Sequence, residues 1–176
     1  ITGGLGYIGT ELCKLYSGVS WHHKIIIIDN RFISERVNQI RNWNMEFIQG
    51  DILDKKLIEK YCSDADVVHH LAGVTQVPRT KSEANEIQDK KIIEVGEKGT
   101  QNVLDAISKK CKIIFPSTHV VYEGINEVKT DIKENEATNP VLSYSSSKAI
   151  NESQLKNSGK NYVILRLGSV YGYSSD

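Results

Sequence analysis

Residues 1–10 read ITGGLGYIGT, and this stretch decides the fold of the 176-residue chain. Gly3, Gly6 and Gly9 are spaced three apart. Glycines in such a row let a backbone turn tightly and approach another group closely. The residues beyond the turn include apolar side chains at helical spacing, Ile8, Leu12 and Leu15. The stretch therefore predicts a strand end, a glycine turn and an amphipathic helix over 8–17.

Short β-rich runs alternate with helical patterns along the rest of the chain. The predicted strands cover 24–30, 45–50, 65–73, 111–118 and 161–170. The further predicted helices cover 54–62, 84–109 and 142–157. The run KIIIIDN at 24–30 is continuously apolar, which is typical of a parallel strand covered on both faces. The alternation predicts an α/β fold, a doubly wound parallel sheet of the Rossmann type.

Both ends of the chain fall at predicted strands. Ile1 is expected to be the last residue of a central strand, and the segment 170–176 follows another strand. We therefore expect residues 1–176 to be one domain that is truncated at both ends.

Composition excludes several classes of protein. The 22 basic and 22 acidic residues balance, which argues against a nucleic-acid partner. The longest apolar run is far too short to span a bilayer, so no membrane partner is expected. Three widely separated cysteines indicate reduced thiols and a cytoplasmic location.

The glycine turn and Asp29 together predict a dinucleotide site. A helix that begins at such a turn offers free N–H groups and a positive dipole end to a pyrophosphate. Asp29 lies 20 residues past Gly9, at the end of the next predicted strand, where a carboxylate would bind the ribose hydroxyls of NAD. A carboxylate would repel a 2′-phosphate, which favours NAD, while Arg31 leaves NADP open. The alternative is a tight turn with a surface aspartate.

Tyr144 and Lys148, in YSSSK, are four apart and would share one face of a helix. An ammonium and a positive nicotinamide ring nearby would favour the phenolate and make the tyrosine a base. Thr118 ends the apolar run KIIFPST, at the strand edge where ligands bind in open α/β sheets. Its hydroxyl could bond a substrate oxygen. The alternatives are a helix-surface pair and a strand-end cap.

The chain resembles the extended short-chain dehydrogenase/reductase family, in its NAD-dependent nucleotide-sugar epimerase and dehydratase branch, and is UDP-glucose 4-epimerase-like. The motifs that carry the resemblance are TGGLGYIG, GDILD, HHLAGVT, PSTHVVYEG, YSSSK and LRLGSVYG, in family order. The resemblance implies catalytic roles for Thr118, Tyr144 and Lys148. It implies cofactor contacts at Gly3, Gly6, Tyr7, Ile8, Gly9, Asp29, Asn30, Asp51, Ile52, Leu71, Ala72, Gly73, Tyr144 and Lys148.

The resemblance also implies a mechanism. Tyr144 would remove a proton from the sugar C4 hydroxyl while hydride passes to NAD, and an epimerase would then return the hydride to the other face. Lys148 would hold the nicotinamide ribose and lower the tyrosine pKa. Thr118, His119 and Ser169 would contact the sugar. A C-terminal substrate-binding portion is not present in this chain, and a homodimer through the helices 84–109 and 142–157 is expected.

Some residues depart from the family pattern. His119 and Val120 stand where sugar 4,6-dehydratases carry an Asp-Glu pair, which argues against dehydration. Glu123 resembles the V-F-D-G segment of keto-sugar reductases, and Ser169 replaces a usual asparagine. The sequence thus predicts an epimerase. The alternatives are a keto-sugar or other carbonyl reductase and a dinucleotide-binding regulatory module without turnover.

Histidine pairs at 22–23 and 69–70 are the remaining residues that could suggest a metal. No spaced cysteines or carboxylates accompany them, and neighbours in a strand face opposite sides. No metal is expected.

Overall fold

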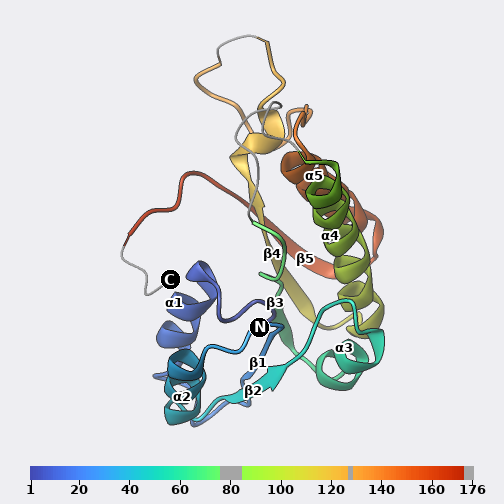
Figure 1. Ribbon diagram of the computed structural model, residues 1–176. Helices are drawn as coiled ribbons and strands as arrows, with labels where there is room; N and C mark the ends of the chain where they lie inside the picture. The colour runs from blue at the N-terminus through green and yellow to red at the C-terminus, as the bar shows by residue number, and fades with distance from the viewer. Residues whose placement is uncertain (76–84, 127–128, 173–176) are drawn as a thin grey trace.

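The computed structural model describes residues 1–75, 85–126 and 129–172 (Figure 1). The helices are α1 (Tyr7–Tyr16), α2 (Ser34–Asn42), α3 (Lys55–Cys62), α4 (Glu86–Ala106) and α5 (Ser143–Asn157), with a short 3-10 helix η2 (His119–Tyr122). The strands are β1 (Ile26–Asp29), β2 (Glu46–Gln49), β3 (Val67–His69), β4 (Lys112–Thr118) and β5 (Asn161–Leu167). None of the described helices is both long and apolar enough to cross a membrane.

All strand pairs are parallel. β1 pairs with β2, and β3, β4 and β5 follow one another in that order. Thr2 joins the two groups, because it forms parallel bridges with Ile28 on one side and His70 on the other. The order across the sheet is therefore β2, β1, Thr2, β3, β4, β5. This order confirms the predicted doubly wound Rossmann-type sheet.

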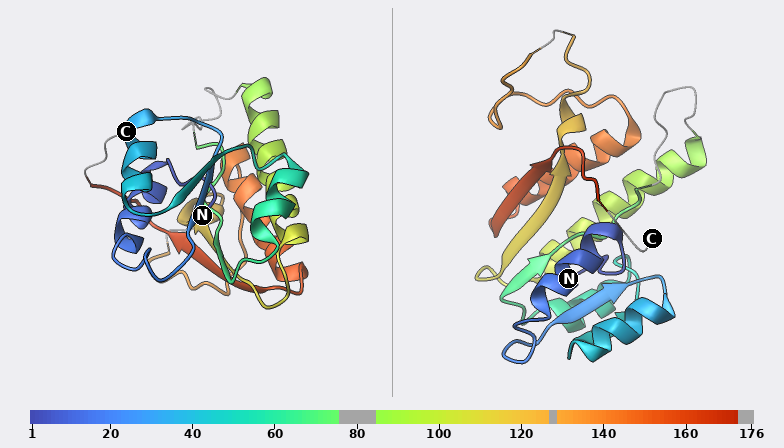
Figure 2. Two further views of the ribbon diagram at one scale, coloured as in Figure 1. Left: turned by 90° about the horizontal axis from the view of Figure 1, so that it is seen from below. Right: turned by 90° about the vertical axis from the view of Figure 1, so that its left-hand side faces the viewer.

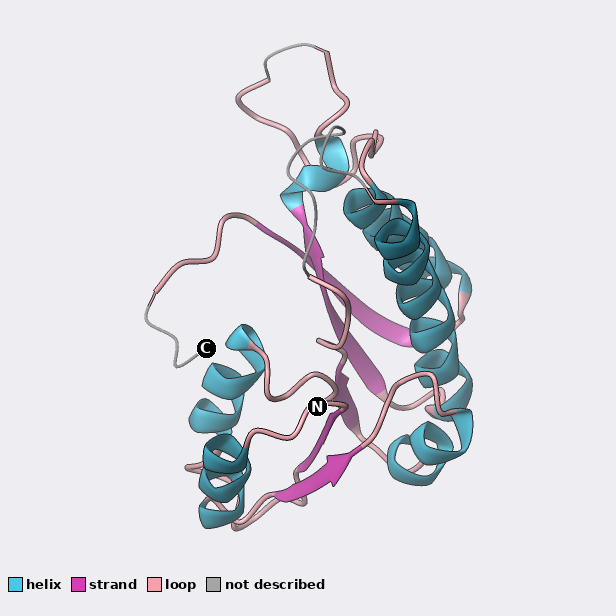
Figure 3. Ribbon diagram, viewed as in Figure 1, coloured by secondary structure: helices cyan, strands magenta, loops and turns pink. Residues whose placement is uncertain are grey.

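Helices cover both faces of the sheet (Figures 1 and 3). Neighbouring residues of β1 point to opposite faces, as in any strand. Ile27 packs into a cluster with Leu5, Cys13 and Val37, from the side of α1 and α2. Ile28 joins the larger cluster with α3, α4 and α5. Burial on both faces explains why residues 24–30 show no alternation.

The predicted strands and the four predicted helices lie where the sequence placed them, most of them with shorter ends. Among the described elements, the short η2 was not predicted, and one α-helix was missed: α2, at 34–42. Its sequence is mostly polar, and Val37 and Ile40 are its two buried apolar residues. Two apolar positions are too few to show a helical period in a sequence.

The buried face of α1 differs from the predicted one. Ile8 and Leu15 were expected to face the core, but they are 37% and 79% exposed. Gly9 and Cys13 are buried instead. The buried face is thus rotated by one residue, about 100°, around the helix. The close approach of Gly9 to the glycine turn sets this rotation, because only a residue without a side chain fits there.

Candidate dinucleotide-binding and catalytic site

The glycine turn requires its glycines at two positions. Gly3 has φ +69°, and a Cβ there would lie 2.6 Å from the amide nitrogen of Ala72. A Cβ at Gly9 would lie 2.4 Å from the carbonyl oxygen of Gly3. Both contacts are closer than real Cβ atoms come to backbone. The turn is therefore pressed between residues 71–73, which follow β3, and the first turn of α1.

Gly6 leaves the start of α1 open. It precedes the helix in an extended conformation, and no side chain caps the helix. The first N–H groups of a helix have no partner within the helix. A Cβ at Gly6 would lie 3.3 Å from the Gly3 carbonyl oxygen and 3.7 Å from the Arg31 guanidinium. Tyr7, Ile8 and Gly9 follow at this open end, which fits the cradle that a pyrophosphate needs.

Asp29 lies at the carboxyl end of β1, directly behind the glycine turn. The Leu5 N–H donates to its Oδ2 at 2.9 Å, and the Arg31 N–H donates to its Oδ1 at 3.0 Å. The Arg31 side chain also contacts Oδ1, at 3.4 Å. Asp29 is therefore buried and braces the turn, and Arg31 is held against a carboxylate. Asn30 and Asp51 lie beside it, joined at 3.1 Å.

Of two further predicted cofactor segments, the one after β3 borders the turn and the one at Ile52 does not. Leu71 and Ala72 run past it, and their amides donate to the Thr2 carbonyl at 3.1 Å and the Thr2 hydroxyl at 3.3 Å. Gly73 follows, exposed. The side chain of Ile52 is 4% exposed and packs into the core. The backbone carbonyl of Ile52 accepts from the Asn102 side chain at 2.9 Å.

The three candidate catalytic residues lie on two elements, β4 and α5, which Lys148 connects. Thr118 is the last residue of the strand, and its Oγ1 accepts the Val120 N–H at 3.3 Å. The Lys148 ammonium, from α5, donates to the Pro116 carbonyl at 2.9 Å. It lies 5.8 Å from the centre of the Tyr144 ring. A single ammonium thus ties the helix of Tyr144 to the strand of Thr118.

Burial shifts the pKa values of two groups in this site. It raises the pKa of Tyr144 above its usual value near 10. Burial also lowers the pKa of Lys148 to about 8. That Lys148 lowers the tyrosine pKa stays a prediction for the complex with NAD. Further positive charge is needed to favour the phenolate.

The two residues predicted to contact only substrate lie at the same end of the sheet. His119 is exposed, and its Nδ1 lies 3.1 Å from the Leu167 carbonyl at the end of β5. Ser169 is exposed on the segment that follows β5. This segment runs toward α1 (Figure 2), where the Tyr7 hydroxyl donates to the Gly172 carbonyl at 2.9 Å. No described side chain joins Ser169 to Thr118 or Tyr144.

Among the described residues, no group of three potential metal ligands comes together. The histidines at 69–70 have other partners. His69 Nε2 lies 2.8 Å from the Tyr16 hydroxyl. His70 is buried between the hydroxyls of Thr2, at 2.8 Å, and Thr100, at 3.1 Å.

Sequence reasoning missed a buried ion pair behind the catalytic group. Glu152 of α5 accepts from Arg166 of β5 at 2.9 and 2.6 Å, and from the Ser117 hydroxyl at 2.6 Å. Arg166 also contacts the Tyr122 hydroxyl of η2. Glu152 is one helical turn beyond Lys148, and Arg166 interrupts an apolar strand. Those two positions are the signals that could have revealed the pair.

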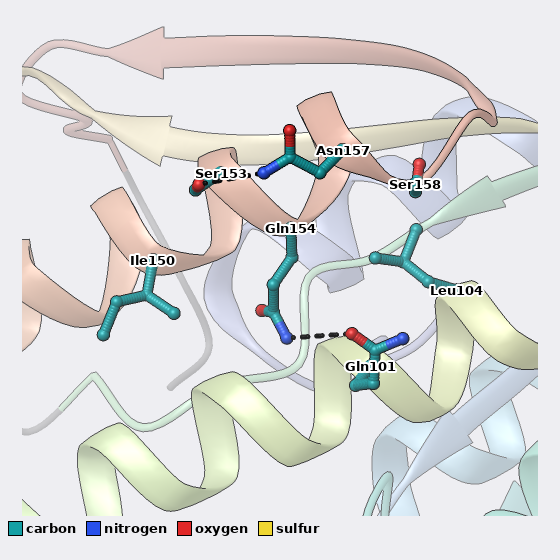
Figure 4. A pocket seen from close by; sticks show the side chains of 7 residues that line it. All are labelled: Gln101, Leu104, Ile150, Ser153, Gln154, Asn157 and Ser158. Carbon is teal, nitrogen blue, oxygen red and sulfur yellow. Dashed lines mark hydrogen bonds between the residues drawn. The ribbon is translucent and has the colours of Figure 1, made fainter.

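A hollow of ≈ 380 Å³ lies elsewhere, between α4 and α5 (Figure 4). The residues that line it are Gln101, Leu104, Ile150, Ser153, Gln154, Asn157 and Ser158. Gln154 of α5 donates to Gln101 of α4 across it, at 3.3 Å. None of the candidate cofactor or catalytic residues lines this hollow. The candidate site lies instead at the carboxyl ends of the strands, from the glycine turn to the end of β4.

Comparison with known proteins identifies the family of the chain. The sequence model of the family described as "NAD dependent epimerase/dehydratase family" matches residues 1–176. The chain belongs to this family. The match covers every described element of the sheet, and the family description confirms the predicted cofactor, NAD.

Individual members of the family show how far the similarity extends. A putative UDP-glucose 4-epimerase of Methanocaldococcus jannaschii is 34% identical over 100% of this chain and 57% of its own length. A dTDP-D-glucose 4,6-dehydratase of Dictyostelium discoideum is 28% identical over 98% of this chain and 43% of its own length. The crystal structure of UDP-glucose 4-epimerase from Brucella ovis in complex with NAD has TM-score 0.73 and 30% identity, over 94% of this chain and 50% of that one. The chain spans about half the length of the relatives it matches.

Proposed function

We propose that this chain is the NAD-binding half of a nucleotide-sugar epimerase that oxidises and re-reduces the sugar at C4. The observation that carries the proposal is the Lys148 ammonium, which holds the helix of Tyr144 to the end of β4, where Thr118 lies. The glycine turn and Asp29 lie at the same edge of the sheet. Relatives named as UDP-glucose 4-epimerases support the nucleotide-sugar class of substrate.

Each residue has a chemical task in this proposal. NAD, when bound, supplies a reversible hydride acceptor with a positive ring. Tyr144 takes the proton of the sugar hydroxyl and later returns it. Thr118 donates a hydrogen bond to the same sugar oxygen. Lys148, whose pKa of about 8 leaves it mostly charged at neutral pH, favours the phenolate together with the ring.

A carbonyl reductase is the alternative on the same scaffold. Glu123 was one reason for it, because of the likeness to V-F-D-G. In the structure, Glu123 bonds the start of α5, which gives it a structural task in any member of this fold. The cytoplasmic location and the homodimer through α4 and α5 stay proposals. The buried thiols of Cys13, Cys62 and Cys111 are free, as a reducing compartment requires.

Replacing Tyr144 by Phe tests the proton transfer. The variant of the complete natural polypeptide that contains residues 1–176 should lose epimerisation of UDP-sugars by about 10²- to 10⁴-fold. Its affinity for NAD should change little, because the ring stays in place. Turnover is followed by coupled assay and NAD binding by calorimetry.

Tyr162→Phe is the matched control, since this tyrosine is 38% exposed on β5. It should retain full activity. Native turnover by Tyr144→Phe would refute the assignment of the base. NAD(H) released from the denatured wild type, near one per subunit, would support epimerisation. Little retained dinucleotide, with a preference for NADPH, would favour the reductase.

A further inference from the structure

The catalytic helix α5 is capped from within only by its first turn, where the Ser145 hydroxyl oxygen accepts the Leu142 N–H at 3.2 Å. The residue before it is Leu142, whose side chain cannot accept a hydrogen bond. The first turn contains no acidic residue. Helix starts are usually stabilised by an oxygen-bearing side chain at this position and by negative charge nearby. Tyr144 is the second residue of α5. If the first turn of the helix were poorly ordered, the position of the candidate base would be poorly defined as well.

Glu123 holds the start of α5 from outside the helix, through the two residues that precede the helix and through Ser145. Its Oε1 accepts the Val141 N–H at 2.8 Å and the Leu142 N–H at 2.7 Å. The Ser145 hydroxyl, in the first turn, bonds the same oxygen. One carboxylate oxygen therefore holds residues on both sides of Tyr144.

Glu123 is charged in this position. Burial alone would raise the pKa of its carboxyl group, but the hydrogen bonds from Ser145, Leu142 and Val141 outweigh burial and hold the pKa below its usual value. A carboxylate at a helix start also meets the positive end of the helix dipole. The contact is therefore stronger than one made by a neutral acceptor.

The chain connects Glu123 rigidly to Thr118. Thr118 caps η2, and Glu123 is the residue directly after η2. Asn139 clamps the returning segment, because its N–H donates to the Val121 carbonyl at 2.8 Å and its side chain donates to the Gly124 carbonyl at 2.7 Å. Thr118 and Tyr144 are thus joined through η2 and one carboxylate.

We propose that Glu123 is a positioning residue, which sets Tyr144 against Thr118 by anchoring the start of α5. The inference rests on the proposed function for its catalytic consequence. The anchoring itself is a property of the chain. It predicts that Glu123 matters for turnover and for the order of the first turn of α5, without contact to substrate.

The test compares Glu123→Ala and Glu123→Gln with the control Glu134→Ala, in the complete natural polypeptide. Glu134 is an exposed glutamate in the same connection between η2 and α5. Amide hydrogen exchange over residues 141–146 should become at least about tenfold faster in Glu123→Ala, intermediate in Glu123→Gln, and unchanged in the control. The Tyr144 phenol, followed by its ultraviolet titration, should move toward its ordinary pKa as water reaches it.

Turnover separates positioning from general damage. In Glu123→Ala, kcat for a UDP-sugar should fall about tenfold while KM stays within about twofold. In a Tyr144→Phe background the same substitution should cause no further loss, because Glu123 acts through Tyr144. Glu123→Gln keeps an acceptor oxygen and should recover part of the rate.

The outcomes distinguish the two proposals. Unchanged exchange and an unchanged Tyr144 titration in Glu123→Ala would overturn the role of Glu123. An equal loss of kcat with and without Tyr144 would overturn it as well. If the wild type turned over no nucleotide sugar, the proposed function would fail, and the exchange and titration results would still decide whether Glu123 anchors α5.

Discussion

His70 shows at the scale of one residue how the fold fixes a protonation state. Its ring is buried, with each nitrogen bonded to a threonine hydroxyl. Burial, with the nearby Lys148 charge, lowers its pKa from 6.5 to about 3. The ring therefore stays neutral at physiological pH and serves to join Thr2, next to the glycine turn, to α4.

This lowered pKa predicts acid sensitivity. Below pH 6.5 the unfolded chain binds a proton at His70 that the folded chain does not bind until about pH 3. The free energy of unfolding should therefore decrease as the pH is lowered from 6.5 toward 3. This group contributes at most about 1.4 kcal/mol per pH unit to the decrease. Urea unfolding at pH 7.5, 6 and 5 measures the slope.

His70→Asn should flatten that slope. The control His23→Asn removes an exposed histidine and should leave the slope as in the wild type. Equal slopes in all three proteins would mean that the pKa of His70 is not lowered in the folded protein.

Residues differ in how much of their role a sequence can show. Gly3, Gly9 and Asp29 were predicted because the turn and the strand that place them are local. Glu123 was interpreted through a likeness to reductases, since its partners lie 18 to 22 residues further along the chain. Only the folded connection between η2 and α5 brings them together.

At the scale of the elements, the Glu152–Arg166 pair locks α5 to β4 and β5. The side chains are 3% and 10% exposed. Burial alone would raise the pKa of Glu152, but hydrogen bonds from Arg166 and Ser117 outweigh it and lower the pKa. Ser117 precedes Thr118, so the pair also fixes the end of the catalytic strand.

Removing one partner of this pair should destabilise the protein more than removing both. Arg166→Leu leaves a buried carboxylate without its main partner and should lower the free energy of unfolding by about 3–5 kcal/mol. The double variant Arg166→Leu/Glu152→Leu should lose less than Arg166→Leu alone, because no buried charge remains. Chemical denaturation of the single and double variants gives the values.

The exposed pair Glu94–Lys98 is the control, with its atoms 2.6 Å apart. Lys98→Ala should leave the free energy of unfolding almost unchanged, because solvent screens an exposed pair. A double variant less stable than Arg166→Leu would contradict the expectation that an unpaired buried carboxylate causes the loss in the single variant.

Two elements were harder to predict than the others, for physical reasons. Helix α2 has two buried apolar side chains in nine residues, and it is stabilised by their packing against the core. Helix α1 shows a clear apolar stripe, but the stripe lies beside the buried face. There the backbone contact at Gly9 decided the orientation, and backbone contacts leave no trace in hydrophobic periodicity.

At the scale of the whole molecule, the candidate cofactor site spans both parts of the sheet. Asp29 belongs to the part with β1 and β2, whereas residues 71–73 and Lys148 belong to the part with β3, β4 and β5. A bound dinucleotide would therefore bridge the two parts. The parallel, doubly wound sheet was predictable from the alternation of elements, whereas the site at its edge stays a prediction.

Adding NAD should stabilise the complete natural polypeptide as one unit. At a free concentration of 100 times Kd, the gain is about 2.7 kcal/mol, and one cooperative transition should shift upward in temperature. NADP at the same concentration should give a smaller shift, because in the proposed complex Asp29 faces the ribose and would repel a 2′-phosphate. Differential scanning calorimetry measures both.

An equal shift with NADP would mean that Arg31 turns from Asp29 to the phosphate. A shift in only one of two separate transitions would mean that the dinucleotide contacts one part of the sheet alone.

The bridge at Thr2 has a consequence for the order of assembly during translation. Thr2 is synthesised before either of its partners, Ile28 and His70. The ribosome releases residue 28 well before residue 70. Thr2 can therefore pair with Ile28 while its side toward His70 is still unpaired. The centre of this sheet is then an open edge for some forty residues of synthesis. A nascent chain stalled in that interval should be the one that needs a chaperone most.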